Sequence, residues 1–389
     1  MLFYYSRNIK LFSEESNKLF TKITIQEILK KLENETELAL DCETTGLDYL
    51  NDRVIMLQLG TKTDQYVIDT RDLDISVFKP LLHLNNTLFI GHNIKFDYNM
   101  LKQYGIVLNN VYDTMTADMV IHNGKYSMKE LRDTRRFSLK GVYHFYFKKY
   151  ISKEVREEFT TWGSTPFTDD QIKYGAWDVV YPLEIKKVQE ELIELYALKK
   201  TINLENKVIL ALGDMEYNGM KIDRKKWAKI DEIYKKRLKD TIIELDNILI
   251  EKDNSFKIKA VQLDLFSGIA SSERLTYINW SSDQQVYRLL TTIFKIYPED
   301  KDGKQSSSSK ALELLDIETK ELPIVKTLLR FRKEDKIISS FGQKYLNENL
   351  KTDGRLHTTY NSIVATGRVS SRNPLYRGAL YCKVYRITG

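Results

Sequence analysis

The fold of this chain is decided by LALDCETTGLD, residues 38–48. An apolar run that stops at charged residues is typical of a buried strand that ends at a site. Side chains alternate along a strand, so Asp41 and Glu43 share one face while Cys42 points to the other. Two neighbouring carboxylates repel each other unless a cation lies between them. The stretch therefore predicts a strand whose end holds a divalent metal ion.

A second motif follows further along the chain in FIGHNIKFDYNML, residues 89–101. It reads as an apolar strand that stops at Gly91 and continues into a helix. Asn93 and Asp97 are four residues apart, which predicts that they lie on one face of this helix. The motif adds an amide and a further carboxylate to the candidate site.

A third motif is DDQIKYGAWDVVYPLEI, residues 169–185. Thr168 with Gln171 three residues later is typical of a helix start with a capping box. Within this helix Tyr174 and Asp178 are four residues apart and share a face. The sequence therefore predicts a helix that presents a phenol and a carboxylate together.

Each motif alone has an ordinary explanation, because two acids at a strand edge are more often solvated surface. Together, in this order and each at the end of a suitable element, they resemble the DEDD family of 3′–5′ exonucleases, in its tyrosine-containing subclass. The resemblance implies a ribonuclease H-like α/β domain, with a mixed sheet flanked by helices, over residues 1–203.

The resemblance also implies roles for individual residues. Asp41 would bridge two metal ions, and Glu43 and Asp178 would complete the ion on the nucleophile side. Asp97 would hold the other ion through water, and Tyr174 would orient the attacking water. Hard oxygen ligands suit Mg²⁺ or Mn²⁺. Two such ions about 3.5–4 Å apart can activate a water and stabilise the leaving oxygen of an in-line displacement.

Contacts with a nucleic-acid substrate are implied by the same resemblance. Thr44 and Asn93 would contact the 3′ end of the strand, and Leu47 would wedge against its terminal base. An ordinary apolar residue in the turn after the strand would explain Leu47 equally well. Both readings of Leu47 stay open on the sequence alone.

Helical periodicity begins at Leu204 and marks a second domain. A predicted apolar stripe ends before Gly219, which is placed where a helix stops; the stripe consists of Leu204, Val208, Leu212 and Met215. The next helix is predicted to begin at the N-cap Asp223. One of its faces carries Lys225, Lys229, Lys236 and Lys239. Such a basic face is usually solvated helix surface, although it could equally follow a phosphate backbone.

This second half resembles family A DNA polymerases. LENKVILALGDMEYNGMKID, residues 204–223, is similar to the entry into their polymerase region. Three later stretches are similar to the thumb and to the helix that leads back to the palm: residues 278–290, 303–315 and 328–341. The resemblance implies a mainly helical thumb-like domain over residues 204–355.

Residues 356–371, LHTTYNSIVATGRVSS, resemble the entry to the palm in the same family. Arg368 would then bind duplex DNA, although a generic loop would explain Arg368 alone. We expect residues 356–389 to begin a palm, and residues 375–389 match nothing in the family. The loss of match in mid-motif indicates that the reading frame leaves a polymerase gene there, through an intron or a frameshift. Templated synthesis would then need a second chain that carries the palm and fingers.

Composition agrees with a folded protein of more than one domain, because 389 residues exceed what one core usually organises and 42% are apolar. The 60 basic and 54 acidic residues leave a formal charge of only +6, so a DNA surface must come from local clustering. Cys42 and Cys382 lack the neighbours of a zinc site or a disulfide framework. No segment has the roughly 20 apolar residues of a membrane span. We therefore expect a cytoplasmic protein without a membrane partner.

The sequence thus predicts a metal-dependent 3′–5′ exonuclease that proofreads during DNA replication, with single-stranded DNA 3′ ends and primer-template duplex as partners. An RNA-trimming relative of ribonuclease D is one alternative, against which the thumb-like half argues. A non-catalytic DNA-binding fragment is the other, against which the intact set of five site residues counts. Four aromatic residues stay unassigned, because most aromatics at such spacing are core: Tyr126, Phe137, Tyr143 and Phe147.

Overall fold

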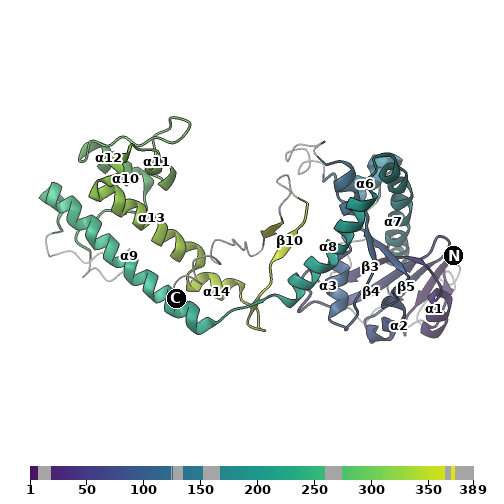
Figure 1. Ribbon diagram of the computed structural model, residues 1–389. Coiled ribbons are helices and arrows are strands. Elements are labelled where there is room, and N and C mark those ends of the chain that lie inside the picture. The colour runs from purple at the N-terminus through teal and green to yellow at the C-terminus, as the bar shows by residue number, and fades with distance from the viewer. Residues whose placement is uncertain are drawn as a thin grey trace. The chain divides into compact units, whose positions relative to one another are not determined.

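The computed structural model describes residues 1–7, 19–123, 125, 135–151, 167–258, 274–363 and 369–372. The chain divides into two compact units. The first comprises Met1–Met220 and His357–Gly389, and the second comprises Lys221–Leu356 (Figure 1). Short strands carry the chain from one unit to the other and back: β8 (Met220–Lys221) and β9 (Arg355–Leu356).

A seven-stranded mixed sheet forms the centre of the first unit, with strand order β2-β1-β5-β4-β3-β6-β7. The three strands β3, β4 and β5 pair antiparallel, whereas β6 lies parallel to β3 and β7 parallel to β6. β4 is buried along its whole length, as expected of a strand covered on both faces. The strands are β1 (Leu2–Tyr5), β2 (Thr21–Lys22), β3 (Glu37–Thr44), β4 (Val54–Gly60), β5 (Gln65–Asp69), β6 (Leu88–Gly91) and β7 (Val111–Asp113).

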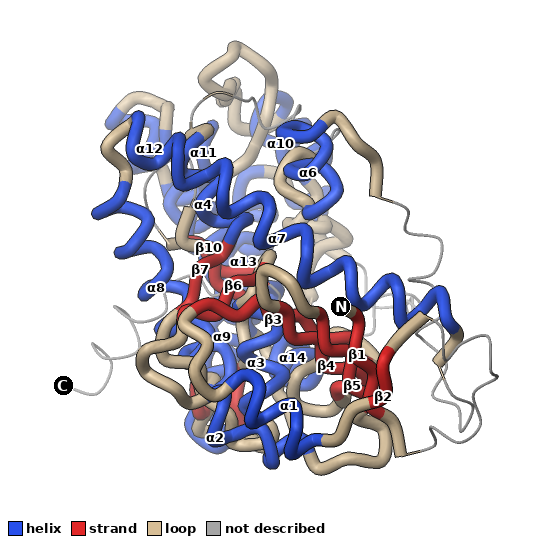
Figure 2. The backbone as a smooth tube through the Cα atoms, turned by 90° about the vertical axis from the view of Figure 1, so that its right-hand side faces the viewer, coloured by secondary structure: helices blue, strands red, loops and turns tan. Residues whose placement is uncertain are grey.

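Helices cover both faces of this sheet. On the face to which Leu40 and Cys42 point, the core is shared with α1 (Ile25–Leu32), α2 (Lys79–Leu82), α3 (Lys95–Lys102) and α8 (Lys199–Asn218). On the other face α7 (Asp169–Leu195) crosses the strands (Figure 2). Two further helices pack beside α7: α4 (Thr114–Ile121) and α6 (Leu139–Phe147). Because side chains alternate along β3, burying Cys42 on one face presents Asp41 and Glu43 to α7.

Local signals place the ends of the helices where the sequence predicts them. The Thr168 hydroxyl accepts a hydrogen bond from the Gln171 N–H at 3.2 Å, and the Gln171 side chain accepts one from the Thr168 N–H at 2.9 Å. In the second unit the Asp223 carboxylate accepts from the Lys226 N–H at 3.0 Å. The predicted helix starts are confirmed.

The predicted boundary after residue 203 falls inside α8, and the whole helix belongs to the first unit. The predicted apolar stripe on α8 was wrong, because Leu204 and Met215 are 59% and 52% exposed. Instead, Asn206 and Glu216 lie on the buried face with Ile202, Ile209 and Gly213. A stripe drawn from apolar residues alone misses these polar side chains, which are buried because distant segments supply their hydrogen-bond partners.

The second unit is helical, and its core lies between α9 (Arg224–Lys252) and α13 (Pro323–Phe341). Trp280 fills this core, and its indole N–H donates to the buried Asp246 carboxylate at 2.8 Å. The other helices are α10 (Asp283–Thr292), α11 (Ser309–Glu313), α12 (Ile317–Glu321) and α14 (Gln343–Asn349). The predicted order of an α/β domain followed by a mainly helical region is confirmed.

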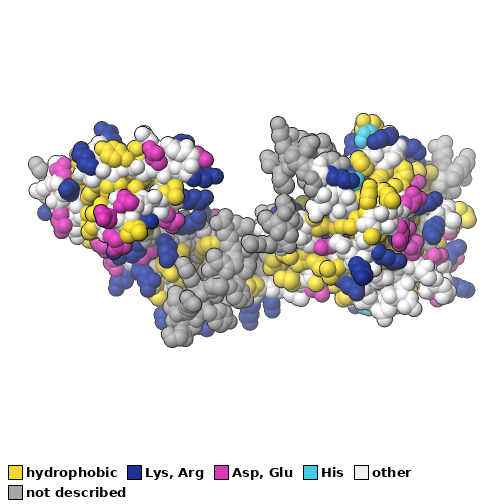
Figure 3. All heavy atoms as spheres, turned by 45° about the horizontal axis from the view of Figure 1, so that its top comes forward, with side chains coloured by type: hydrophobic (Ala, Val, Ile, Leu, Met, Phe, Trp, Pro, Cys, Tyr) yellow, Lys and Arg dark blue, Asp and Glu magenta, His cyan; other side chains and the backbone are white. Residues whose placement is uncertain are grey.

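Charge is mixed on the face of the molecule that Figure 3 shows. The four lysines of the predicted basic face on α9 are exposed. On the face that Figure 3 shows, lysine and arginine side chains lie among acidic ones. None of the described helices combines the length and apolar character needed to cross a bilayer.

Gly219, which ends α8 as predicted, has φ 57° and ψ 178°, a backbone conformation that only glycine adopts readily. A Cβ built on it would lie 2.7 Å from the His357 ring. We therefore expect Gly219→Ala to lower the free energy of unfolding of the first unit by about 2–4 kcal/mol, measured by hydrogen exchange of peptides from the first unit across a urea series. The matched control in the same unit is Gly105→Ala, where φ is 67° and the nearest atoms are the end of the flexible Lys79 side chain, with an expected loss of about 1–2 kcal/mol. Equal losses at both positions would show that the His357 contact does not matter.

Candidate active site

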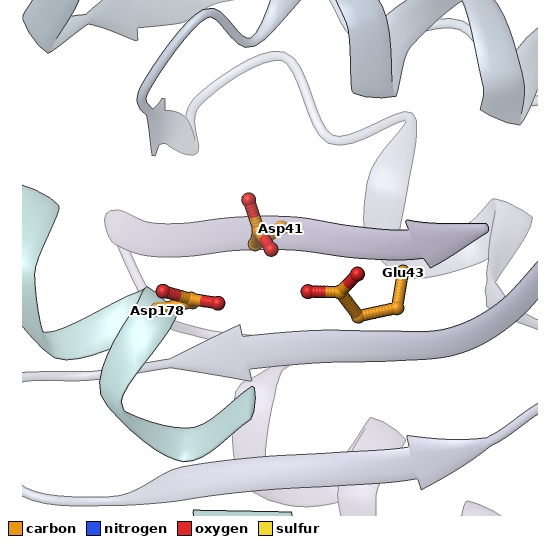
Figure 4. Close-up of side chains that lie close together, drawn as sticks. All are labelled: Asp41, Glu43 and Asp178. Atoms are coloured by element: carbon orange, nitrogen blue, oxygen red, sulfur yellow. The ribbon is translucent and has the colours of Figure 1, made fainter. Parts of the chain in front are cut away.

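Three carboxylates from two elements converge at the end of β3. Asp41 and Glu43 come from β3 and Asp178 from α7, and their side chains point toward one another (Figure 4). One oxygen of each lies within 4.8 Å of the others. Asp178 is only 5% exposed, so water screens its charge poorly. Such a group of anions is costly unless a cation neutralises it.

The register of the central sheet sets the two carboxylates of β3. Asp41 pairs with Gln58 and Glu43 with Met56 on β4, and the register shifts between Glu43 and Thr44. An irregularity of this kind ends regular pairing and re-aims side chains. The strand thus stops pairing regularly where its carboxylates face α7.

Close packing of α7 on the sheet brings Asp178 to β3. Gly175 faces β4, where an added Cβ would lie 2.8 Å from the Met56 sulfur. Any larger residue at this position would push the helix away from the sheet. Tyr174, the preceding residue, packs partly buried against the cluster that contains Ile55 and Met56. Tyr174 and Asp178 therefore leave α7 on the side that faces the carboxylates of β3.

Asp97 lies outside the group of three but close to it. It is on α3 and is 3% exposed. Burial raises the pKa of its carboxyl well above the ordinary range, and the charges of Glu43 and Asp113 add to this, against hydrogen bonds from backbone N–H groups, including that of Cys42. A bound cation would counter the burial and favour the ionised form.

Asn93 does not share a helical face with Asp97, and that prediction was wrong. α3 begins at Lys95, and Asn93 has φ 63° in the turn before it. Asparagine tolerates this left-handed conformation better than most residues. The N–H groups of Asn93 and Ile94 both donate to the Asp113 carboxylate, at 3.1 Å each. A carboxylate distant in sequence therefore fixes the turn.

Asp113 is a site residue that the sequence analysis missed. It is 1% exposed, and besides the turn at Asn93 it caps α4 by accepting from the N–H groups of Met115 and Thr116, at 2.8 and 3.1 Å. The signal available in the sequence was an aspartate directly before the helix start at Thr114, which is typical of an N-cap. Asp113 thus supports the turn that leads into the helix of Asp97.

The Asp52 carboxylate helps to hold the turn after β3, and Leu47 lies at the surface of this turn. Asp52 accepts from the Thr45 hydroxyl at 3.0 Å and from the Asp48 N–H at 2.8 Å. The Thr44 hydroxyl donates to the carbonyl of Gly46 at 2.7 Å. Leu47 is 80% exposed. Its predicted contact with a terminal base, and that of Thr44 with the 3′ end, stay predictions. Arg368 lies outside the described residues.

Two protein-family models match the chain. The one described as 3′-5′ exonuclease matches residues 17–193, and the one described as DNA polymerase family A matches residues 252–376. The first match contains the three converging carboxylates and Asp97. The second covers most of the helical unit and the segment after it.

Curated relatives and a solved structure agree with the family models. DNA polymerase I of Aquifex aeolicus is 29% identical over 372 residues, which cover 90% of this chain and 55% of that protein. The DNA polymerase of Escherichia phage T5 is 25% identical over 361 residues, which cover 87% of this chain and 40% of that protein. The POL domain of Pol1 from M. smegmatis, solved with DNA primer-template and dNTP, has the same fold, with a TM-score of 0.63 at 18% identity over 90% of this chain and 53% of that chain.

The chain spans about half the length, or less, of these relatives. The predicted resemblance is confirmed in both halves, as is the α/β fold of the first, with its mixed sheet flanked by helices. The chain is therefore similar to the DNA polymerases of family A, over residues 17–193 in their 3′-5′ exonuclease segment and over residues 252–376 in the segment that the polymerase model describes.

Proposed function

We propose that this chain is a metal-dependent exonuclease that hydrolyses phosphodiester bonds at the 3′ ends of DNA and proofreads during replication. The observation that carries the proposal is the convergence of Asp41, Glu43 and Asp178 within a domain that matches the 3′-5′ exonuclease model. Nucleic-acid hydrolysis needs a centre of positive charge at the scissile phosphate. Three clustered carboxylates supply its ligands.

The chemistry of the donor set fits two Mg²⁺ or Mn²⁺ ions. All of its donors are carboxylate oxygens, which these hard cations prefer. Asp41, Glu43 and Asp178 would hold one ion, and Asp41 and Asp97 the other. When bound, such ions supply an activated water and stabilise charge on the leaving oxygen. The buried position of Asp178 and Asp97 supports this assignment, because a buried carboxylate gains most from a nearby cation.

The remaining site residues would bind and orient the reactants. Tyr174, one helical turn before Asp178, would orient the attacking water through its hydroxyl. Thr44 and Asn93 would contact the 3′ end of the strand, and the exposed Leu47 would pack against its terminal base. Arg368 would contact duplex DNA.

DNA is the substrate that the second half of the chain supports. Residues 252–376 match a DNA polymerase model, and the curated relatives are DNA polymerases. A thumb-like region would bind primer-template duplex, which an RNA-trimming enzyme does not need. Comparing the turnover of a DNA strand and an RNA strand of the same sequence tests the choice, and faster turnover of RNA would overturn it.

Removing divalent metal is expected to stop the reaction completely. We expect purified protein with Mg²⁺ to shorten a 5′-labelled primer, annealed to a template with a mismatch at its 3′ end, one nucleotide at a time. EDTA should stop the shortening, because the carboxylates alone repel the phosphate, and excess Mg²⁺ should restore it. Gel electrophoresis of the labelled products gives the readout.

Two outcomes of this assay would contradict the proposal. Shortening that persists in EDTA would rule out the metal-dependent chemistry. Products from cleavage inside the strand would show an endonuclease. A 3′-labelled primer is the control for direction, because an enzyme acting from the 3′ end releases its label in the first step.

A further inference from the structure

An exposed tryptophan is the neighbour in sequence of a candidate active-site carboxylate. Trp177 directly precedes Asp178 on α7 and is 51% exposed. The two other tryptophans that the structure describes are more buried, and both indole N–H groups have acceptors: Trp280 donates to Asp246 and Trp227 to the carbonyl of Phe341. Half-exposure of so large an apolar ring is unfavourable in water unless a ligand covers it.

The Trp177 ring is held in place by other aromatic residues. It stacks on Tyr181, one turn further along α7, with ring centroids 5.4 Å apart and an interplanar angle of 18°. Tyr181 in turn packs against Tyr143 of α6 at 4.6 Å, and Tyr143 against Phe147 at 4.6 Å. The row therefore runs from the residue next to Asp178 across to the neighbouring helix.

Tyr143, on which Tyr181 packs, is the buried member of this row of aromatic residues. Tyr143 is 6% exposed, its hydroxyl donates to Glu184 at 2.7 Å, and it belongs to a core cluster with Val142 and Ile185. A ring that rests on a fixed neighbour loses little freedom when a second flat group stacks on it. The fixed partners hold the indole plane of Trp177 ready for a ligand.

We propose that Trp177 is a stacking platform for an unpaired nucleobase of the substrate strand, near the scissile phosphate. The proposal rests on the proposed exonuclease function and names a substrate contact for it. Adjacent residues are about 3.8 Å apart at Cα. Their side chains point about 100° apart around the helix, so a base on Trp177 would belong to a nucleotide near the one whose phosphate faces Asp178, and not to that nucleotide itself. Stacking is tolerant of base identity, which suits an enzyme that removes any nucleotide.

Fluorescence provides a test that needs no catalysis. A single-stranded DNA oligonucleotide is titrated into the full chain carrying Asp41→Ala, without divalent metal, and tryptophan emission is recorded. We expect quenching by the stacked base, which Trp177→Phe in the same background should largely abolish. Trp177→Ala should weaken binding about 5- to 100-fold, and Trp177→Phe less, because phenylalanine keeps part of the stacking surface.

The matched control is Tyr196→Ala. Tyr196 is an aromatic residue of similar exposure, 48%, at the end of α7, about 27 Å along the helix from Asp178. Its loss should leave binding unchanged. Thermal unfolding of each variant shows whether it folds, and if Trp177→Ala does not, the comparison with Trp177→Phe carries the test.

Oligonucleotides with a single abasic position locate the base. Moving the abasic site inward from the 3′ end should reveal one position where the loss of the base weakens wild-type binding but has no further effect on Trp177→Ala. Additive effects at every position would overturn the proposal, as would binding by Trp177→Ala that equals that of Tyr196→Ala. In turnover, the platform predicts a raised KM with little change in kcat.

The two proposals fail in different ways. Wild-type protein that quenches on binding but never shortens DNA would overturn the exonuclease function and leave the platform intact. If wild-type protein and Trp177→Ala shorten DNA with the same KM and kcat, the stacking platform would be overturned and the exonuclease function would stand.

Discussion

Asp41→Ala is expected to slow the shortening of a DNA 3′ end by about 1000-fold or more. Asp41 is the carboxylate that would contact both metal ions, so its loss removes charge stabilisation worth several kcal/mol, and each 1.36 kcal/mol is a factor of ten in rate. The measurement is the single-turnover rate on a labelled mismatched primer-template with saturating Mg²⁺.

Binding of single-stranded DNA should not weaken in the same variant, because the loss of a carboxylate reduces repulsion of the phosphates. Asp170→Ala is the matched control, since Asp170 is a carboxylate on α7 whose side chain is 75% exposed, and its rate should equal that of the wild type. A variant at Asp41 that keeps its rate would show that the converging carboxylates are not the catalytic centre. A variant that loses both rate and binding would show a folding defect instead.

Glu216→Ala is expected to destabilise the first unit by about 3–5 kcal/mol, which is typical of breaking a buried ion pair. Glu216 is 3% exposed and accepts from Lys95 at 2.6 Å and from Asn99 at 2.9 Å, both on α3. It also accepts from the backbone N–H of Tyr360 at 2.6 Å. Without it, the Lys95 ammonium, 16% exposed, keeps only the carbonyl of Tyr360 as a hydrogen-bond partner among the described contacts.

Because the chain has two units, a local probe is needed. Pulsed hydrogen exchange across a urea series, read out on peptides of α3 and α8, reports the first unit alone. Glu194→Ala is the control, since its pair with Lys199 is 3.8 Å apart and exposed, and a change within about 0.5 kcal/mol is expected.

The double variant Lys95→Met, Glu216→Ala should lose less than the two single variants together, because no buried charge is left unpaired. Strict additivity would show that the pair does not act as a unit. This pair also bears on the site, because Lys95 and Asn99 flank Asp97 on α3. Glu216 thus fixes the helix that carries the fourth predicted carboxylate.

Short-range sequence signals were enough to predict several strand ends and helix starts of this protein. The strand that ends at Asp41, the capping box at Thr168 and the N-cap at Asp223 depend on residues within a few positions of each other. Hydrogen bonds of that range form in any tertiary context, so the pattern and the structure agree. The spacing of Asp41 and Glu43 likewise fixed which face of β3 they share.

Contacts between distant residues were decided by the tertiary structure alone. Asn93 lies outside the helix, in a turn with a left-handed conformation, because its N–H donates to Asp113, which is twenty residues away. The buried face of α8 is partly polar because Lys95 meets Glu216 across 121 residues. The exposure of Trp177 likewise depends on which helices pack beside α7. Sequence periodicity records burial only through apolar residues, whereas a buried polar group is stable only where the fold brings it a partner.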